Sequence, residues 1–550
     1  MYIKKQYLLI IVAMAITPLW SFQMEGIAIF DRLNQQGASV RLMEGTVAGR
    51  DIPSQLNNRV SSIRISRGWK VRVAANPNGS GRVQVYNAIN RDLEINLPLV
   101  LDNNASFFRV QRLWGIRLYD NQNQSGSFER IKEGVYSDIQ IPGNLNKKIT
   151  SIRLLKGFMV TLAENSNGTG YSVNYIARTE DLNINLPSRL NNRISYIKVK
   201  PWRDVRKKGV GRSLKQGGGD VAVRMNADWW YNWNSNARST RGYDYVPLHD
   251  APPSNRSIEN IKSITTALHL NLFNEPDDKK PGGQPHDMTP AQAIPTHKEF
   301  LKTGLRIGSP APKENGAFSW LCEYVSGVKR GGFRMDYITI HWYDWGGWFR
   351  DQNPRSDPAQ IFERFKRYLN RIHDLYGLPI WITEFNANKH RVPSVQKRFL
   401  ELALPWLDRQ DFIERYAYFT CKDNCQFENA NGGLSEIGRL YRNHRSTLSI
   451  PEANWRGPSL NNVRRPTCPV RGGNNKFTDD DTTSGFKIVQ NPVQSKIEIY
   501  GLNYDTLLRV FTTSGQRVMK SFGQSLDVEN LVPGIYFLKL EDVTLKFVKQ

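Results

Sequence analysis

The sequence predicts a multidomain protein with three kinds of fold in succession: all-β domains, then a (β/α)8 barrel, then a small C-terminal β-sandwich. Three observations lead to this prediction. A four-fold repeat of turn motifs separated by short alternating strands fills residues 24–200. Apolar strand-like runs then alternate with helical segments over about 230 residues, the size of such a barrel. Short strands return after residue 485.

Length and composition agree with several packed domains. The chain has 550 residues, 39% of them hydrophobic, and about 150 residues per domain gives three or four domains. The net charge is +24, from 75 Lys and Arg against 51 Asp and Glu. Over residues 24–200 these side chains number 24 and 14, without a single basic block. This diffuse charge argues against a nucleic-acid partner and leaves an acidic polysaccharide open.

The first residues have the layout of a secretory signal. Lys4 and Lys5 precede an apolar run from Tyr7 to Leu19 that is short for a membrane span. We therefore expect residues 1–22 to be a signal peptide and the mature chain to lack a membrane anchor. The spacing of the four cysteines argues against structural zinc. Cys421 and Cys425 are the local pair for a disulfide in an oxidising compartment.

The N-terminal repeat has a period of 44 or 45 residues, and its motif copies begin at Asn57, Asp102, Asn146 and Asn191. Each copy starts with Asn or Asp and carries Ser or Thr four positions later. The pattern resembles the βγ-crystallin family, in which paired Greek-key units form two-sheet sandwiches. The resemblance implies two such domains.

Calcium binding is an expectation from this resemblance, because the family motif supplies oxygen ligands to calcium. Phe107, Lys147 and Tyr196 replace motif residues in the later copies. The alternative is that the motif serves only as a turn that folds the sandwich. The resemblance implies one complete ligand set, in the first copy: Asn57, Asn58, Ser61 and Ser62.

The middle region carries the elements expected of a barrel. The predicted strands are 305–310, 335–343, 378–385 and 415–420, and the predicted helices are 358–376 and 394–408. The basic and glycine-rich stretch before them reads as a linker, as does the polar stretch after them. The predicted boundaries are a signal peptide at 1–22, β domains at 24–110 and 111–200, a linker at 201–219, the barrel at 220–452, a linker at 453–485 and a C-terminal domain at 486–550.

Glu275 and Glu384 are the candidate catalytic residues. Each follows an apolar run at the expected end of a strand, and the strand ends of a barrel face one rim. Hydrolysis of a glycosidic bond needs two carboxyl groups, one to protonate the leaving oxygen and one to attack or to activate water. Eleven of the 14 Trp lie between Trp202 and Trp455, and flat rings suit sugar faces, with core packing as the alternative.

The residues from 221 to 449 resemble a known enzyme family. The motifs include Trp229–Trp233, Phe273–Asp277, Asp336–Tyr343 and Pro379–Phe385. They resemble glycoside hydrolase family 128, a TIM-barrel family of retaining endo-β-1,3-glucanases. The resemblance implies Glu275 as acid/base and Glu384 as nucleophile. With the aromatic clusters, the expected substrate-binding residues are Asn274, His341, Tyr343, Trp230, Tyr231, Trp342 and Trp345.

The C-terminal residues also resemble a known module. Asn491-Pro492, Thr513–Gly515 and Leu531–Tyr536 are similar to turn elements of the type IX secretion C-terminal sorting domain. The resemblance implies export by the type IX secretion machinery to the cell surface or the medium.

Together these features predict a secreted, monomeric endo-β-1,3-glucanase without a catalytic cofactor and with β-glucan as its polysaccharide partner. Two alternatives stay open. One is a hydrolase of another polysaccharide, which the positive charge would suit if that polysaccharide were anionic. The other is a non-catalytic glycan-binding surface protein.

Overall fold

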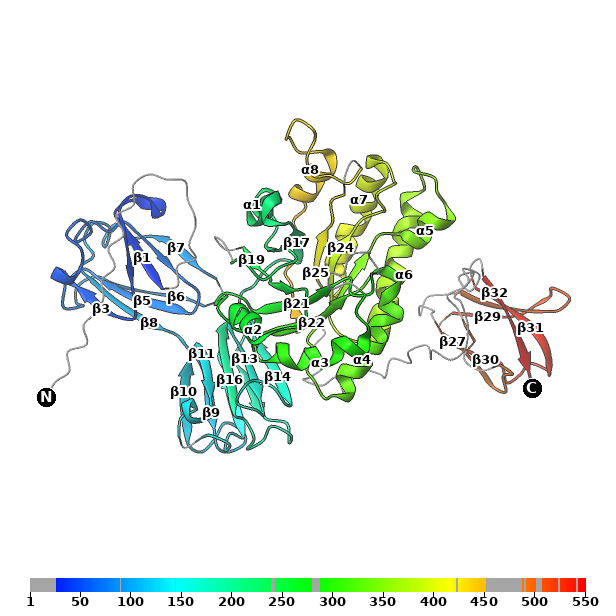
Figure 1. Ribbon diagram of the computed structural model, residues 1–550, viewed down its shortest axis with the longest axis horizontal. Helices are drawn as coiled ribbons and strands as arrows, with labels where there is room; N and C mark the ends of the chain where they lie inside the picture. The colour runs from blue at the N-terminus through cyan, green and yellow to red at the C-terminus, as the bar shows by residue number, and fades with distance from the viewer. Residues whose placement is uncertain are drawn as a thin grey trace. The chain divides into compact units, whose positions relative to one another are not determined.

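The computed structural model describes residues 26–451, except 90, 144, 239–242, 279–286 and 422–423, and residues 487–550, except 489–490, 501–506, 523–524 and 541–542. These residues form two compact units, one on each side of the gap at 452–486. The predicted order of an all-β region, an α/β domain and C-terminal strands is confirmed (Figure 1). The predicted signal peptide and the linker at 453–485 lie outside the described residues. Within them, no helix is long and apolar enough to cross a membrane.

The first β domain consists of two four-stranded antiparallel sheets around an apolar core. Each sheet takes three strands from one repeat unit and one strand from the other, so the two units are interlocked. Alternation of buried and exposed residues along the strands supplies the inner faces. The sheets are β2-β1-β4-β7 (Ser39–Leu42, Ile27–Phe30, Ser62–Ile65, Leu93–Asn96) and β3-β8-β5-β6 (Gly45–Ala48, Phe107–Arg112, Trp69–Ala74, Val83–Ala88).

The second β domain repeats this arrangement strand for strand, as the repeat in the sequence predicts. Its core is a separate apolar cluster that includes Ile116, Leu118 and Val160. The sheets are β10-β9-β12-β15 (Phe128–Lys132, Trp114–Tyr119, Ser151–Leu154, Leu182–Asn185) and β11-β16-β13-β14 (Gly134–Ser137, Tyr196–Pro201, Phe158–Ala163, Ser172–Ala177).

The third domain is built on parallel strands that close into a ring, called the barrel below. The ring has two sheets, β19-β18-β17-β25-β24-β23 and β20-β21-β22. They are joined because β19 runs on into β20 and because Gly308 of β22 bridges Tyr337, which directly precedes β23. The strands are β17 (Lys208–Gly211), β18 (Trp229–Tyr231), β19 (Asp244–Tyr245), β20 (Leu248–His249), β21 (His269–Asn274), β22 (Arg306–Ala311), β23 (Ile338–Trp342), β24 (Ile380–Phe385) and β25 (Ile413–Tyr418).

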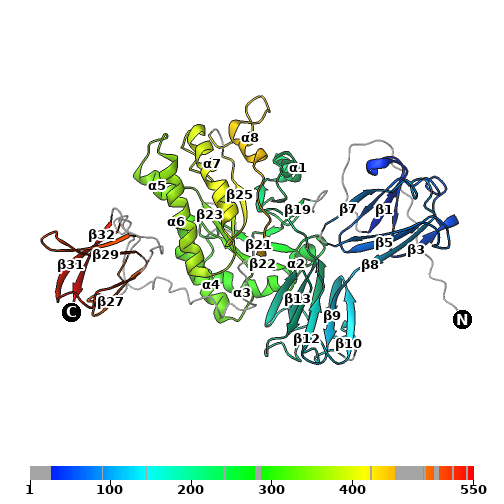
Figure 2. The ribbon, with the colours of Figure 1, turned by 180° about the vertical axis from the view of Figure 1, so that it is seen from behind.

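Helices follow the strands and cover the outside of the ring (Figures 1 and 2). The helix predicted at 358–376 is found with those bounds, because an apolar stripe repeats along it and Gly377 ends it in a left-handed conformation. The helices are α1 (Gly218–Arg224), α2 (Asn255–Lys262), α3 (Pro290–Leu301), α4 (Trp320–Arg330), α5 (Trp345–Arg350), α6 (Pro358–Tyr376), α7 (Pro393–Arg409) and α8 (Glu436–Asn443).

The stretch 201–219, predicted to be a linker, instead contains β17, the first strand of the barrel. The linker was predicted because the stretch is basic, but two of its basic residues, Lys207 and Lys208, are buried. The Lys207 ammonium donates to the carbonyls of Leu407, Asp408 and Gln410 at the end of α7. The Lys208 ammonium donates in the same way to Tyr441 and His444 at the end of α8. Both lysines therefore satisfy carbonyls that a helix leaves unpaired at its C-terminus.

The C-terminal unit is a small β domain with its own apolar core, centred on Ile497, Val510 and Leu538. It contains a four-stranded antiparallel sheet and a three-stranded one. The sheets are β29-β28-β31-β32 (Arg517–Phe522, Leu507–Thr512, Gly534–Leu540, Val543–Lys549) and β26-β27-β30 (Lys487–Ile488, Lys496–Tyr500, Ser525–Asp527).

Candidate active site

Two glutamates far apart in the sequence lie on either side of one histidine at the C-terminal rim of the barrel. Glu275 follows β21, His341 lies on β23 and Glu384 lies on β24. Nδ1 of His341 is 3.2 Å from Oε1 of Glu275. Nε2 of the same ring is 3.6 Å from Oε1 of Glu384. The structure thus brings both predicted carboxylates and His341 into one cluster.

The Glu384 carboxylate is held by three donors. The Trp233 indole N–H donates to Oε1 at 2.8 Å, and the Tyr231 hydroxyl donates to the same oxygen at 3.3 Å. The Tyr343 hydroxyl donates to Oε2. The carboxylate is 5% exposed. Contacts on both oxygens of a buried carboxylate fix its direction, as a reacting group requires.

The backbone around the site departs from regular geometry. Strand β21 shifts register against β22 twice before it ends, and bulges of this kind turn side chains in new directions. Phe273, Glu275 and Trp233 have φ angles of 24°, 44° and 56°. Such left-handed conformations cost about 1–3 kcal/mol each in residues other than glycine. At Glu275 the conformation is held by its N–H, which donates to the Ala311 carbonyl at 2.8 Å.

The donors around Glu384 keep their protons over a wide pH range. Burial, followed by the negative charge of Glu384, raises the pKa of Tyr231 and of Tyr343 well above the usual value. For His341, burial opposes the charged form, but the charge of Glu384 and the contact with Glu275 outweigh it and raise the pKa. The imidazole therefore keeps a positive charge to higher pH than a free histidine does.

Glu314 is a further carboxyl beside the site, and it is not among the residues predicted from the sequence. Its Oε2 accepts the backbone N–H groups of Tyr343 at 2.9 Å and Trp345 at 3.2 Å. Burial raises the pKa of Glu314 to about 7, although these N–H groups lower it. The Tyr368 hydroxyl donates to the backbone carbonyls of both Glu314 and His341, at 3.0 Å each. Glu314 thus anchors the turn that carries Tyr343.

The tryptophans expected to bind substrate divide between the rim and the core. Trp342 packs against Phe365 and Phe399 of the outer helices, with ring centroids 4.7 and 5.6 Å away. Trp230 packs against α1 and Tyr245. The substrate-binding prediction for these two residues is therefore wrong, because side chains alternate along a strand and theirs point out of the ring. Trp345 lies on α5 and is partly exposed.

The same alternation places Trp229, Tyr231 and Trp233 on the inner side. Tyr231 is among the predicted substrate-binding residues, whereas Trp233, which donates to Glu384, is not. The two-residue spacing from Tyr231 was the signal that could have identified Trp233.

Asn274 precedes Glu275 and offers an unused acceptor. Its backbone N–H donates to Oδ1 of Asp250 at 2.7 Å, which fixes the residue. Its side-chain Oδ1 is buried and has no hydrogen-bond partner among the described residues. A buried oxygen without a partner is costly unless a ligand supplies one. Asn274 is therefore suited to accept a hydrogen bond from a substrate hydroxyl.

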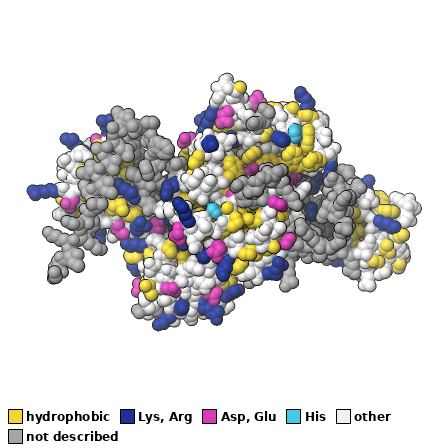
Figure 3. Space-filling view, in the orientation of Figure 1, with side chains coloured by type: hydrophobic (Ala, Val, Ile, Leu, Met, Phe, Trp, Pro, Cys, Tyr) yellow, Lys and Arg dark blue, Asp and Glu magenta, His cyan; other side chains and the backbone are white. Residues whose placement is uncertain are grey.

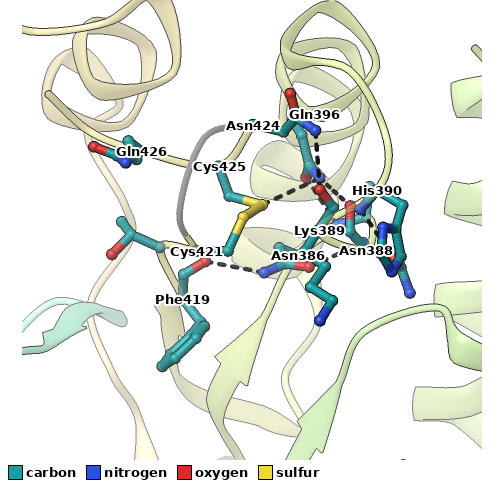
Figure 4. The surroundings of a disulfide bond; sticks show 12 residues. Asn386, Asn388, Lys389, His390, Gln396, Phe419, Cys421, Asn424, Cys425 and Gln426 are labelled. Carbon is teal, nitrogen blue, oxygen red and sulfur yellow. Dashed lines mark hydrogen bonds between the residues drawn. A yellow bond between two sulfur atoms is a disulfide. The ribbon is translucent and has the colours of Figure 1, made fainter. Parts of the chain in front are cut away.

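A disulfide stabilises the loop that follows β25 beside the site. The predicted bond between Cys421 and Cys425 is confirmed (Figure 4). Just before it, the Phe419 ring packs edge-on against Trp233 and Tyr343, with centroids 6.1 and 5.7 Å away. The Phe419 carbonyl accepts the Asn386 side-chain amide at 3.1 Å. The loop thus supports two of the three donors to Glu384.

The predicted calcium ligands lie in the first β domain and differ in whether they have hydrogen-bond partners. The Ser62 hydroxyl donates to the Arg32 carbonyl at 2.6 Å and accepts the Gln35 N–H. Oδ1 of Asn58 accepts the Ser106 hydroxyl. Oδ1 of Asn57, in contrast, is buried and has no hydrogen-bond partner in the described chain.

The unpartnered oxygen recurs at the first position of every motif copy: Asn57, Asp102, Asn146 and Asn191. A set of buried oxygens without donors is the chemistry that a hard cation such as calcium requires. Each copy offers one such oxygen, and calcium binding stays a prediction. Asn57 is the residue of the first copy whose oxygen is available to hold the ion.

Comparison with known families agrees with this geometry. Residues 214–441 match the family described as the glycosyl hydrolase catalytic core. The barrel domain is thus similar to glycosyl hydrolase catalytic cores. The match covers all the strands from β18 to β25 and hence both glutamates.

Individual relatives match this glycosyl hydrolase domain. Alkali-sensitive linkage protein 1 of Schizosaccharomyces pombe is 31% identical over 245 residues, which cover 40% of this chain and 41% of that protein. The match thus spans about two fifths of the curated relative. A GH128 subgroup I endo-β-1,3-glucanase from Amycolatopsis mediterranei, solved with laminaripentaose, is 25% identical, with 43% of this chain and 99% of that chain covered and a TM-score of 0.37. A GH128 subgroup VII oligosaccharide-binding protein from Trichoderma gamsii is 18% identical, with 43% and 93% covered and a TM-score of 0.33.

The C-terminal unit also matches a known family. Residues 487–550 match the secretion system C-terminal sorting domain. The prediction of a type IX sorting domain is confirmed. The protein is therefore directed by type IX secretion to the cell surface or the extracellular space.

Proposed function

We propose that the glycosyl hydrolase domain is a retaining endo-β-1,3-glucanase in which Glu275 is the acid/base and Glu384 the nucleophile. The observation that carries the proposal is the placement of the two carboxylates on either side of His341, with Glu384 held by three donors. A nucleophile must point at the anomeric carbon, and contacts on both oxygens of Glu384 fix its direction. Glu275, with 18% of its side chain exposed, is accessible to a leaving-group oxygen.

The reaction follows two displacements on these groups. Glu384 attacks the anomeric carbon while Glu275 gives its proton to the departing glycosidic oxygen, so the C–O bond breaks and a glycosyl-enzyme ester forms. Glu275, now ionised, takes a proton from water, and that water attacks the anomeric carbon and releases Glu384. Asn274 accepts a hydrogen bond from the sugar beside the reacting carbon.

The finer assignments rest on the motif resemblances. The eight strand positions of the ring, with β19 and β20 counted as one interrupted strand, suit a TIM barrel. The ordered motifs from 229 to 385 favour β-1,3-glucan as the substrate. The interlocked β domains suit βγ-crystallin-like modules that bind calcium through Asn57 and its counterparts.

The test is reducing-end release from a panel of β-1,3-glucan, mixed-linkage glucan, cellulose and a sulfated glycan. Wild type should release reducing ends from β-1,3-glucan, and Glu275→Gln and Glu384→Gln should each lose nearly all of this activity. Glu323→Gln, an exposed carboxylate on α4, is the matched control and should keep full activity. Binding of β-1,3-glucan without release by wild type would refute the enzyme and favour a glycan-binding protein.

A further inference from the structure

Three arginines stand directly opposite one another on the outer face of the second β domain. In the register of sheet β10-β9-β12-β15, Arg117 pairs with Arg130 on one side and with Arg153 on the other. Their neighbours Ile116 and Leu118 point into the core, so the three guanidinium groups share the outer face. Like charges directly opposite each other destabilise a sheet. The row therefore opposes stability unless something binds it.

The charges in this row are only partly neutralised. Arg153 forms an ion pair with Asp181, with contacts of 3.0 and 2.9 Å. Among the described residues, no ion pair is found for Arg117 or Arg130. Nε of Arg117 is buried and has no hydrogen-bond partner there. Two of the three guanidinium groups are thus available to an anion.

The first β domain provides an internal comparison, because its sheets have the same strand order. At the corresponding positions the row reads Arg41, Ala28 and Arg64. Alanine replaces the central arginine, and Arg64 is 3.6 Å from Glu94 and 4.0 Å from Asp92. The uncompensated row is therefore particular to the second domain and does not follow from the fold.

The surroundings of the row suit a sugar chain. Phe128 is 46% exposed. The guanidinium carbons of Arg117 and Arg130 lie over its ring, 5.9 and 5.6 Å from the ring centroid. An exposed flat ring packs against the C–H face of a sugar while the guanidinium groups bind its acidic substituents. Asn183, opposite Arg153, is exposed and adds an amide for hydroxyl groups.

This face is also the one turned away from the barrel. The opposite sheet makes the contacts with it: the Thr161 hydroxyl donates to the Gly304 carbonyl at 2.9 Å, and the Lys198 ammonium donates to Thr303 at 2.6 Å. On the surface seen in Figure 3, basic side chains are scattered, with acidic ones between them. The three directly aligned arginines therefore differ from the scattered basic side chains on that surface.

We propose that this arginine row, with Phe128, is a binding site for anionic polysaccharides that carry sulfate or carboxylate groups. The site is separate from the glutamates of the barrel and does not depend on the substrate proposed for them. It would hold the enzyme on an acidic matrix while the barrel acts on its own glycan. An aliphatic surface of the kind that inserts into lipid is missing from the row itself, which favours a polysaccharide over a membrane.

The test compares two double variants of the full chain that remove the same charge. Arg117→Gln/Arg130→Gln changes the proposed site, and Arg41→Gln/Arg64→Gln changes the equivalent positions of the first domain. Binding to dextran sulfate, carboxymethyl dextran and neutral dextran is measured at about 0.15 M salt, where long-range charge effects are screened beyond about 8 Å. Thermal melting of each variant checks that it is folded.

The expected result is binding of wild type to one or both anionic dextrans and none to neutral dextran. The first double variant should bind about tenfold more weakly, as the loss of two exposed charge contacts predicts, whereas the control should bind like wild type. Equal weakening in both double variants would overturn the proposal, because net charge alone would explain it. Binding to phosphatidylglycerol vesicles but to neither anionic dextran would also overturn it.

Discussion

Glu314 makes the stability of the barrel depend on pH. Burial raises the pKa of its carboxyl to about 7 from the value of 4.5 in an unfolded chain. Between these two pH values the folded protein holds a proton that the unfolded chain has released. The free energy of unfolding therefore falls as the pH rises from 4.5 to 7. The difference in pKa corresponds to an upper limit of about 3 kcal/mol.

The perturbation that tests this effect is Glu314→Gln, which keeps an oxygen for the N–H groups of Tyr343 and Trp345 but does not titrate. Relative to wild type, the variant should gain up to about 3 kcal/mol of stability between pH 4.5 and pH 8. Urea unfolding followed by tryptophan fluorescence measures this, because 11 of the 14 Trp lie between Trp202 and Trp455.

The control is Glu323→Gln, the exposed carboxylate on α4, whose stability curve should run parallel to that of wild type. If the Glu314→Gln curve were also parallel to wild type from pH 4.5 to pH 8, the buried carboxyl would not titrate in this range. The reasoning from burial would then be refuted.

Three further predictions follow from the contacts of the site and of the β domains. Tyr343→Phe keeps the ring but removes the donor to Oε2 of Glu384, so kcat on β-1,3-glucan should fall by roughly tenfold to a hundredfold and the melting temperature should also fall; an unchanged kcat would contradict the positioning role. His341→Gln should lower the free energy of unfolding most below pH 6.5, and this loss relative to wild type should shrink as the pH rises through the raised pKa of His341. A loss of stability that does not change with pH would contradict the attraction between charged His341 and the two glutamates. Calcium should raise the melting temperature of the full chain, and Asn57→Ala should remove part of that shift; an equal shift in both would exclude Asn57 as a ligand.

The elements with a strong periodic pattern were predictable from the sequence. Helix α6 has an unbroken apolar stripe and a terminal Gly377, and its bounds were predicted correctly. The four motif copies predicted two β domains of the same construction, which the strand orders bear out. Glu275 and Glu384 could be selected because each ends an apolar run and strand ends gather at one rim.

The remaining features depend on burial, which composition does not reveal. Lys207 and Lys208 looked like linker residues, but each is buried against carbonyls at the end of a helix. Trp230 and Trp342 belong to aromatic clusters, yet the two-residue period of a strand turns them into the core. Glu314 lacks a sequence signal of its own, because its role comes from backbone N–H groups that only the folded turn brings near it.

The most direct test of the central claim uses azide rescue of two alanine variants on a 4-nitrophenyl β-laminarioside. In Glu275→Ala the ester with Glu384 still forms, so azide should attack it and give the β-glycosyl azide, with retention. In Glu384→Ala azide should replace the nucleophile and give the α-glycosyl azide, with inversion. Proton NMR of the anomeric hydrogens distinguishes the two products. The β-azide from Glu384→Ala, or the α-azide from Glu275→Ala, would contradict the assigned roles.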